Sequence, residues 1–202
     1  MDRPVGLILA GGLSRRMGGG DKALRPLGGE AILARIVRRV APQASALLLN
    51  ANGPAERFGL DLPVVPDSLP DTPGPLAGIL AGLDHVAAAF AGARYLLTVP
   101  ADCPFLPADL AARLGEVAQK AGAAYAASGG RTHPVVGLWP VEARETLRRL
   151  LADGERRVER WTARVGAVAV EWPAKPCDPF FNVNTPDDLA EAERLVAAYP
   201  AL

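Results

Sequence analysis

The sequence predicts an α/β fold: a single three-layer, Rossmann-like domain in which helices cover both faces of a mostly parallel β-sheet. Short apolar segments, of the length of strands buried on both faces, alternate with longer segments whose apolar residues recur at helical spacing. The connections between them are short, as they are where each helix leads back to a parallel neighbouring strand. No fixed-period repeat and no low-complexity linker marks a boundary, so residues 1–202 are expected to form one domain.

The first half of the chain contains the most regular segments. Four short apolar runs, each followed closely by a glycine or a polar residue, are expected to be strands: residues 5–10, 46–50, 62–66 and 95–100. Three longer segments with apolar residues on one face are expected to be helices: residues 32–40, 75–90 and 107–121. Arg35, Arg38 and Arg39 fall outside the apolar face of the first helix, so we expect them on a solvated face.

The second half is less regular. Strands are expected at residues 123–127, 133–139 and 165–172, and helices at 141–151 and from the segment 154–160 onward. A last helix is expected to follow Thr185, because Thr185 is a good N-cap and Pro186 suits the first helical position. Asp187 and Asp188 then lie near the positive end of the helix dipole.

Composition limits the classes of partner. The chain has 50% hydrophobic residues, a formal net charge of +0 and a pI near 6.7, so we expect neither nucleic acid nor a membrane as partner. Cys103 and Cys177 are far apart and form no Cys-x-x-Cys motif, so we expect reduced thiols and a cytoplasmic location. The first apolar run is too short for a transmembrane span and does not resemble a signal peptide.

The segment that follows the first strand combines glycines with cations. Residues 11–22 contain five glycines together with Arg15, Arg16 and Lys22. Glycine lets backbone N–H groups approach a ligand closely, and the cations supply charge for phosphate oxygens. We interpret this segment as a loop that binds a polyphosphate; the alternative is a solvated, glycine-rich turn with incidental arginines.

Three familiar motifs do not fit this loop. A Walker-type loop needs Ser or Thr after its lysine, whereas Ala23 follows Lys22. Residues 18–23 have the letters of a dinucleotide fingerprint, but they do not directly follow the strand. A twin-arginine export signal needs its apolar segment after the arginines, whereas here it precedes them.

Three polar side chains follow other predicted strands of the sheet. Asn50, Asp67 and Asp102 all stand at the carboxyl ends of strands, where open α/β sheets bind their ligands. Asp102 therefore suits a Mg²⁺ ion bound with a nucleoside triphosphate, since Mg²⁺ takes one or two carboxylates, waters and phosphate oxygens. Asp67 suits either a second metal contact or a hydrogen-bonding role. The alternative for Asp102 is a turn or capping residue before Pro104.

The same residues suit nucleotidyl transfer, which depends on positioning and charge neutralisation more than on a protein nucleophile. We find no Ser/His/Asp or Cys/His grouping that would provide one. His133, which precedes Pro134, is expected at a turn or in contact with a substrate rather than as a general base. Cys103 is expected to be a buried, inert thiol, and Cys177 has no evident partner.

The motifs together resemble a known family. Residues 9–12, 16–18 and 21–22 are similar to the signature loop of nucleotidyltransferases, specifically of molybdenum cofactor guanylyltransferases of the MobA type. The resemblance continues in order through several further segments, which run nearly to the end of the chain: residues 48–52, 66–68, 73–78, 100–104, 133–134, 154–157 and 181–186. It implies a fold like that of the nucleotide-diphospho-sugar transferases.

The resemblance also implies roles for individual residues. Catalysis is implied for Arg16, Lys22 and Asp102, with Mg²⁺ on Asp102. Nucleotide contacts are implied for Leu9, Ala10, Gly11, Gly12, Lys22, Asn50, Asp67 and Asp102. Contacts to molybdopterin are implied for Gly74, Gly78, Arg156, Asn182 and Asn184. Related cytidylyltransferases usually have alanine in place of Gly12, so Gly12 favours guanine. Family members often carry cysteine before the aspartate, whereas here Ala101 precedes Asp102 and Cys103 follows it.

The implied activity is transfer of GMP from GTP to the phosphate of Mo-molybdopterin, with release of pyrophosphate. Residues from 1 to about 105 would then bind the nucleotide and those from about 106 to 202 the acceptor. Transient contact with proteins that make or receive the cofactor is also expected. Two alternatives stay open: a cytidylyl or other small-molecule nucleotidyltransferase, and a nucleotide-binding carrier or chaperone of the cofactor without catalysis.

Overall fold

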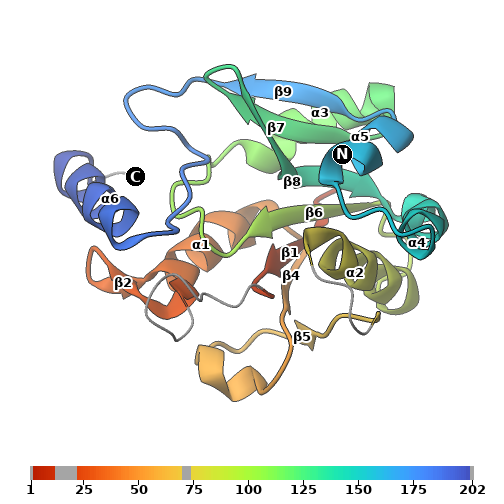
Figure 1. Ribbon diagram of the computed structural model, residues 1–202, viewed down its shortest axis with the longest axis horizontal. Helices are drawn as coiled ribbons and strands as arrows, with labels where there is room; N and C mark the ends of the chain where they lie inside the picture. Colours follow the sequence, from red (N-terminus) through yellow and green to blue (C-terminus); the bar gives the residue numbers. More distant parts are fainter. Residues whose placement is uncertain (1, 12–21, 70–73, 201–202) are drawn as a thin grey trace.

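The computed structural model describes residues 2–11, 22–69 and 74–200, and within these ranges seven strands form one sheet (Figure 1). The strand order is β5-β4-β1-β6-β8-β7-β9. Among these strands, all except β8 run in the same direction, so the predicted mostly parallel sheet is confirmed. The strands span Val5–Leu9 (β1), Ala46–Asn50 (β4), Val64–Val65 (β5), Tyr95–Pro100 (β6), Ala124–Ser128 (β7), Arg131–Pro140 (β8) and Val168–Trp172 (β9).

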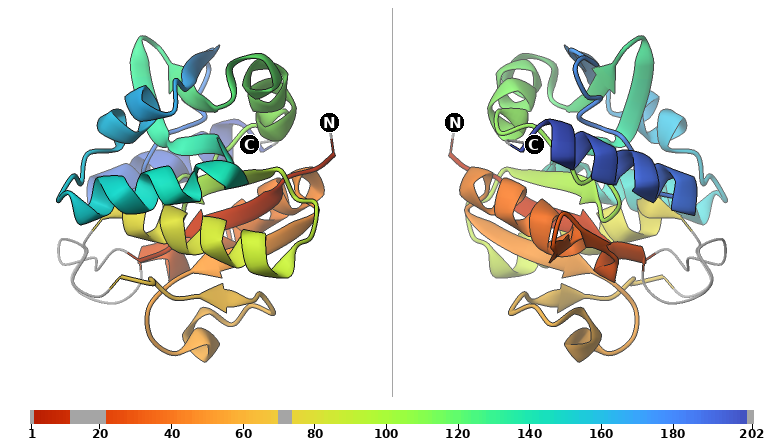
Figure 2. Two further views of the ribbon diagram at one scale, coloured as in Figure 1. Left: turned by 90° about the vertical axis from the view of Figure 1, so that its right-hand side faces the viewer. Right: turned by 90° about the vertical axis from the view of Figure 1, so that its left-hand side faces the viewer.

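Helices cover both faces of the sheet, as predicted for three layers (Figure 2). Buried side chains from α1, α3 and α6 pack on one face, and those from α2, α4 and α5 pack on the other. The helices span Ile32–Val40 (α1), Pro75–Ala89 (α2), Leu110–Ala121 (α3), Arg144–Ala152 (α4), Val158–Arg164 (α5) and Pro186–Ala198 (α6). Short 3₁₀ helices occupy Lys22–Leu24 (η2), Ala41–Gln43 (η3), Ala55–Phe58 (η4) and Val141–Ala143 (η5), and Pro26–Leu27 (β2) pairs with Glu30–Ala31 (β3) in a small hairpin.

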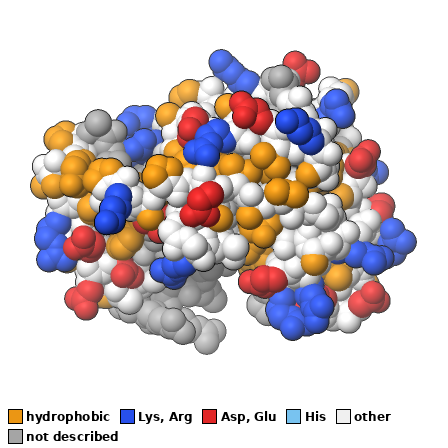
Figure 3. All heavy atoms as spheres, turned by 90° about the horizontal axis from the view of Figure 1, so that it is seen from above, with side chains coloured by type: hydrophobic (Ala, Val, Ile, Leu, Met, Phe, Trp, Pro, Cys, Tyr) orange, Lys and Arg blue, Asp and Glu red, His pale blue; other side chains and the backbone are white. Residues whose placement is uncertain are grey.

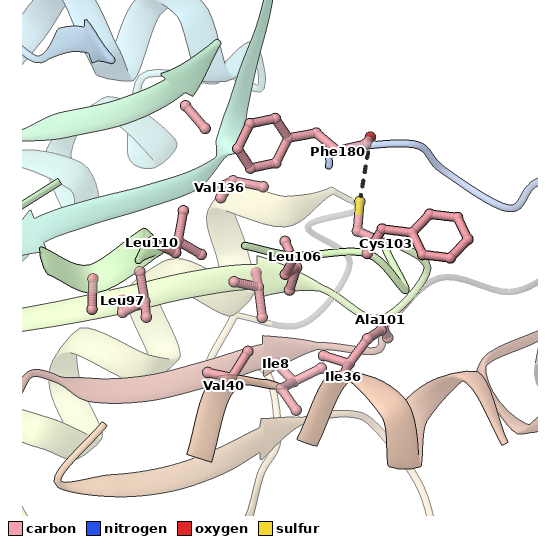
Figure 4. Packing of buried hydrophobic residues seen from close by; sticks show 14 of the residues in the cluster. Ile8, Ile36, Val40, Leu97, Ala101, Cys103, Leu106, Leu110, Val136 and Phe180 are labelled. Carbon is pink, nitrogen blue, oxygen red and sulfur yellow. Dashed lines mark hydrogen bonds between the residues drawn. The ribbon is translucent and has the colours of Figure 1, made fainter. Parts of the chain in front are cut away.

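The central strand β1 is buried on both faces, which explains its uninterrupted apolar sequence. Ile8 packs in the cluster that includes Ile36 and Val40 of α1 (Figure 4), whereas Leu7 packs in the cluster on the opposite face. Successive side chains of a strand point to opposite faces, so residues 5–9 contribute to both hydrophobic cores.

Backbone hydrogen bonds fix the level at which the central strands end. In the parallel register Leu9 lies beside Asn50 of β4 and Pro100 of β6. Beyond the strands, Ala10 N donates to Asn50 O at 2.8 Å and Ala101 N donates to Leu9 O at 3.0 Å. Residues that follow these three strands therefore meet at one edge of the sheet.

Several predicted boundaries are wrong for local reasons. The segment predicted as a strand at 62–66 pairs only at Val64–Val65, where flanking prolines at 63 and 66 lack the N–H that a ladder needs. Strand β9 begins at Val168 rather than 165, because Val165 ends α5 with a backbone bond to Trp161 O. Residues 154–157 form a turn, and helix α5 begins only at Val158.

The prediction of a solvated Arg35 is also wrong. Its relative exposure is 4%, whereas Arg38 is exposed as expected. The hairpin of β2 and β3 lies over this part of α1, so that a Cβ on Gly28 would lie 3.0 Å from Arg35 Nη2. Glu30 on the same hairpin is 3.5 Å from Arg35 Nε and 2.7 Å from Arg38 Nη2. Side-chain hydrogen bonding by Arg38 lowers the pKa of Glu30, and burial only partly opposes this.

The exterior agrees with the balanced composition. On the face seen in Figure 3, basic and acidic side chains are intermixed with apolar ones. Of the helices that the described ranges contain, none is both long enough and apolar enough to span a membrane.

Close packing between α2 and the sheet leads to a stability prediction for Gly82→Ala. A methyl group at Gly82 would lie 2.4 Å from Leu7 Cδ2 and 2.9 Å from Leu96 Cδ2, so core side chains must shift. We expect the free energy of unfolding to fall by about 1–3 kcal/mol, the usual cost of overpacking, in urea titrations. Ala88→Ser, which adds an atom on the exposed side of the same helix, should cost less than about 0.5 kcal/mol. Equal effects of the two changes would contradict this account.

Candidate active site

Lys22, Asp102, Asn182 and Asn184 form a polar cluster at the end of β6. Lys22 Nζ forms a salt bridge with Asp102 Oδ2 and donates to Asn184 Oδ1 at 2.7 Å. Asn182 Nδ2 donates to the other carboxylate oxygen, Asp102 Oδ1, at 3.1 Å. The side chains of Lys22 and Asp102 keep relative exposures of 21% and 13%, so the pair is accessible to a ligand.

The two asparagines of this cluster come from a segment far along the chain. Val183 N donates to Asp102 O at 2.9 Å, and the Val183 side chain is completely buried. This backbone bond lays residues 182–184 across the end of β6. Asn182 and Asn184 flank Val183, so that Asn182 reaches the carboxylate of Asp102 and Asn184 reaches the ammonium group of Lys22.

Helix α6 fixes the far end of that segment with a capping box. Thr185 Oγ1 accepts from Asp188 N at 3.1 Å, and Asp188 Oδ2 accepts from Thr185 N and Asn184 N at 2.8 and 2.9 Å. Burial by itself would raise the pKa of Asp188, but these hydrogen bonds lower it below the ordinary value. The predicted Thr185 cap is thereby confirmed.

A second polar cluster lies on the other side of β1. Asn50 has a relative exposure of 3%, and its Nδ2 donates to Val65 O and to Asp67 Oδ1, both at 3.0 Å. Asn52 Nδ2 donates to Asp67 Oδ2 at 2.9 Å, and Asn52 Oδ1 accepts from Asp67 N at 3.0 Å. Asp67 is therefore held in place by amides and carries no ion pair among the described residues.

The close approach of α2 requires the glycine at position 78. A Cβ at Gly78 would lie 2.2 Å from Asn50 Oδ1 and 2.8 Å from Leu9 Cδ2. Gly78 thus lies against Asn50 and Leu9, two of the residues predicted to contact the nucleotide, and supports Asn50 by packing. Gly74 immediately precedes α2 with φ of +117°, a conformation that favours glycine.

Among the residues that the structure describes, Arg156 contacts none of the other predicted site residues. Its Nη1 donates to Leu151 O and Glu155 O, both at 2.8 Å, so the guanidinium group is directed back to its own turn. The Glu155 carboxylate organises the turn by accepting from Arg156 N and Arg157 N at 3.0 Å. Hydrogen bonding by the Arg157 side chain is the main cause that lowers the pKa of Glu155 to about 2. This turn lies at the end of the molecule where α2 begins (Figure 2).

The structure thus brings Lys22, Asp102, Asn182 and Asn184 together, and separately Asn50 and Asp67. Between these clusters run Leu9, Ala10 and Gly11, and a Cβ at Gly11 would lie 3.7 Å from Asn50 Oδ1. Gly12 and Arg16 lie outside the described residues. The roles given to all these side chains stay predictions.

Sequence reasoning did not identify three residues at this edge. Asn52 forms hydrogen bonds with Asp67, and its position two residues after Asn50 could have identified it from the sequence. Ser128 and Asp178 contact each other at 2.8 Å between Oγ and Oδ1, but they are 50 residues apart and carry no shared motif.

The structure also places His133 and the two cysteines, Cys103 and Cys177. His133 lies within β8, which confirms the strand predicted at residues 133–139 and contradicts the alternative that placed His133 at a turn. Residues 129 and 130 make the turn, with positive φ. Both cysteines are free thiols, and Cys103 is buried as predicted; Cys177, for which burial was not predicted, is buried as well. Burial raises the pKa of the Cys103 thiol well above its ordinary value, and Cys103 Sγ lies 3.4 Å from Asn182 Oδ1.

The donor atoms at this edge of the sheet suit a metal that binds together with a ligand. Within the described ranges no three His, Cys, Asp or Glu side chains are grouped as a metal site. Mg²⁺ does not need such a group, because a single carboxylate with phosphate oxygens and waters suffices. Asp102 is a carboxylate of this kind, at a strand end beside a cation.

The fold is that of the α/β proteins that resemble nucleotide-diphospho-sugar transferases, and the two clusters lie at the sheet edge where such folds bind their ligands. The chain belongs to the family of the MobA-like NTP transferase domain, which it matches over residues 6–168.

Similar proteins agree with this family. The chain is 56% identical over 193 residues to a molybdenum cofactor guanylyltransferase of Rhodopseudomonas palustris (strain BisB5), covering 94% of this chain and 92% of that protein. It is 57% identical over 196 residues to one from Bradyrhizobium sp. (strain ORS 278), covering 95% and 92%.

Solved structures share the fold. Molybdopterin-guanine dinucleotide biosynthesis protein A from Archaeoglobus fulgidus superposes with a TM-score of 0.77 at 25% identity, covering 96% of this chain and 99% of that one. A 4-diphosphocytidyl-2C-methyl-D-erythritol synthase from Anaerococcus prevotii reaches a TM-score of 0.70 at 14% identity, covering 96% and 97%, which shows the fold alone.

His133 provides a prediction that can be measured by NMR. Burial lowers its pKa below the ordinary value of 6.5; Arg131 acts in the same sense, and Asp178 and Glu171 oppose it. In a proton NMR titration, assigned by loss of the signal in His133→Gln, we expect a midpoint below 6.5. Because the unfolded chain then binds this proton before the folded protein does, the free energy of unfolding should decrease as the pH falls through that window. A midpoint at or above 6.5 would contradict the burial argument.

Proposed function

We propose that this protein transfers GMP from GTP to the terminal phosphate of Mo-molybdopterin, giving the guanine dinucleotide form of the cofactor and pyrophosphate. The observation that carries the proposal is the cluster of Lys22, Asp102, Asn182 and Asn184, found in a chain that is 56% identical to a molybdenum cofactor guanylyltransferase. The reaction would take place in the cytoplasm, with transient contacts to proteins that make or receive the cofactor.

The two clusters suit the two ends of GTP. Asn50, Asn52 and Asp67 surround one side of the β1 terminus, and a carboxylate there suits the adjacent N1–H and N2–H donors of guanine. Lys22 and Asp102 lie on the other side of β1, where the triphosphate would extend. The backbone of Leu9, Ala10 and Gly11 connects the two sides.

We propose Mg²⁺ as the metal and Asp102 as its protein ligand. Asp102 fits because it presents carboxylate oxygens next to the position proposed for the phosphates, and Mg²⁺ prefers such oxygens. When bound, Mg²⁺ would supply positive charge to the triphosphate and to the departing pyrophosphate. Lys22 would then exchange its contact with Asp102 for phosphate oxygens, while Asn184 continues to hold its ammonium group.

The remaining requirement is alignment of the acceptor. An oxygen of the acceptor phosphate forms a bond to the α-phosphorus, and the bond from that phosphorus to the bridging oxygen of pyrophosphate breaks. A phosphate acceptor is already ionised near neutral pH, so no protein base has to remove a proton from it. Lys22, together with Arg16, would neutralise charge, and Asn182, Asn184 and Gly74 would contact the acceptor. Gly78 instead packs behind Asn50, and the Arg156 side chain would have to leave its own turn to reach the acceptor.

A pyrophosphate-release assay with Mo-molybdopterin and each of GTP, CTP, ATP and UTP tests the proposal. We expect release with GTP and Mg²⁺, and none when EDTA removes the metal. Release with CTP alone would instead support a cytidylyltransferase. Binding of GTP without release under any condition would support a carrier.

Substitutions at the phosphate side provide a sharper prediction. Asp102→Ala should reduce kcat by at least about a hundredfold, because it removes the proposed metal ligand. Lys22→Ala should also reduce turnover or weaken GTP binding, since it removes positive charge from the same place. Circular dichroism and thermal unfolding would check that both variants are folded, and Lys120→Ala, on an exposed part of α3, provides a control for loss of a lysine. Wild-type kinetics in Asp102→Ala would show that this carboxylate does not hold the metal.

A further inference from the structure

The segment that carries Asn182 and Asn184 is attached to the β7–β8 hairpin by an unusual set of contacts. Ser128, the last residue of β7, is completely buried, and its Oγ donates to Asp178 Oδ1 at 2.8 Å. The same Asp178 oxygen accepts from Phe180 N at 2.9 Å. Asp178 therefore joins the end of β7 to the backbone two residues before Asn182.

His133 completes this network, and the Asp178 carboxylate determines which atoms donate within it. His133 Nε2 lies 2.8 Å from Ser128 Oγ. The Ser128 hydroxyl has one proton, and a carboxylate can only accept, so this proton is directed to Asp178. His133 must then donate from Nε2 to Ser128 Oγ. Burial lowers the pKa of His133, which favours the neutral imidazole, and the hydrogen bond to Ser128 Oγ places its proton on Nε2.

Packing of Phe180 provides a second attachment. Its ring is 1% exposed and lies between two aromatic rings, at 4.9 Å from His133 and at 5.4 Å from Trp172, the latter edge to face. Phe180 O also lies 3.7 Å from Cys103 Sγ, the residue directly after Asp102 (Figure 4). The segment is thus held by polar and apolar contacts just before it reaches the active site.

These attachments are close enough to the site to control it. Consecutive Cα atoms are about 3.8 Å apart, so the Cα atom of Asn182 stays within about 8 Å of that of Phe180 as long as Phe180 is fixed. At the other end, Val183 N is bonded to Asp102 O and Asn184 N to Asp188 Oδ2. Loss of the Asp178 contact would remove the polar attachment that precedes Asn182, while the bond of Val183 N and the helix cap would persist.

We propose that Asp178 and Ser128 are positioning residues, which hold Asn182 and Asn184 against Asp102 and Lys22 without touching the reacting groups. Their kinetic importance rests on the proposed function, whereas their effect on the two asparagines does not. A displacement of about 1 Å in an active site can reduce a rate by about a hundredfold, so even a partial shift is measurable.

Four variants test the proposal. Asp178→Ala removes the shared acceptor, whereas Asp178→Asn keeps an amide oxygen that can accept from both Ser128 and Phe180. Ser128→Ala removes the bridging hydroxyl from the other side. Thr162→Ala is the matched control, because Thr162 is also buried and donates a single hydroxyl, to Glu159 O in α5.

The first measurement is independent of activity. The side-chain amide signals of Asn182 and Asn184 in a ¹⁵N-correlated NMR spectrum can be assigned by their loss in Asn182→Ala and Asn184→Ala. We expect the Asn182 signal to shift and to exchange faster with solvent in Asp178→Ala and Ser128→Ala, and to stay near its wild-type position in Asp178→Asn and Thr162→Ala. An unchanged Asn182 signal in both Asp178→Ala and Ser128→Ala would overturn the proposal.

The second measurement is kinetic. We expect kcat to fall about tenfold in Asp178→Ala with less than a twofold change in KM for GTP. The KM should hold because the cluster of Asn50 and Asp67, which is proposed to bind guanine, lies on the other side of β1. Asp178→Asn should restore most of the rate, and Thr162→Ala should leave it unchanged. Shifted Asn182 signals with unaltered kcat would overturn the kinetic claim. If the wild-type protein released no pyrophosphate, the proposed function would fail, and the NMR comparison would still decide whether Asp178 positions Asn182.

Discussion

The in-register pairing of β4, β1 and β6 is the constraint on which the site depends. Parallel strands buried on both faces are mostly apolar along their length, so most of their polar side chains lie where the strands end. Thr98 within β6 is an exception, and its hydroxyl is hydrogen-bonded to Val135 O and Trp139 Nε1. Because Leu9 lies level with Asn50 and Pro100, those ends coincide. The bonds from Ala10 N to Asn50 O and from Ala101 N to Leu9 O extend the same register past the strands. Asn50 and Asp102 are therefore placed on opposite sides of the β1 terminus by backbone geometry, before any side chain contributes.

The second half of the chain completes the cluster that contains Lys22 and Asp102. Strand β8 lies between β6 and β7, so the β7–β8 hairpin is joined to the central strands and provides a rigid support. The chain leaves β9, passes the end of β7 at Asp178 and crosses β6 at Val183. Asn182 thereby meets Asp102, which lies 80 residues earlier in the chain, and Asn184 meets Lys22, which lies 162 residues earlier.

The sequence predicts the parallel core and the strand-end residues because both follow from local patterns. Asn50, Asp67 and Asp102 were found from strand periodicity and from the rule that ligands bind at carboxyl ends. The position of β8 was not predicted, since no local pattern determines which strand a hairpin joins. Burial of Arg35 was missed because the covering hairpin of β2 and β3 is only two residues long on each side. Ser128 and Asp178 were missed because only the folded chain brings them together.

The electrostatics of the cluster at the end of β6 suit the proposed binding of a triphosphate. A carboxylate beside a triphosphate would be repelled, so Asp102 would be unfavourable there unless a cation lay between the two. In the described structure Lys22 provides that positive charge, and Asn182 donates a further hydrogen bond to the carboxylate. A ligand that arrives as a metal complex would let Asp102 bind the metal while Lys22 turns to the phosphates. Asn184, whose amide oxygen accepts from Lys22 without a charge of its own, can keep the ammonium group in place through that exchange.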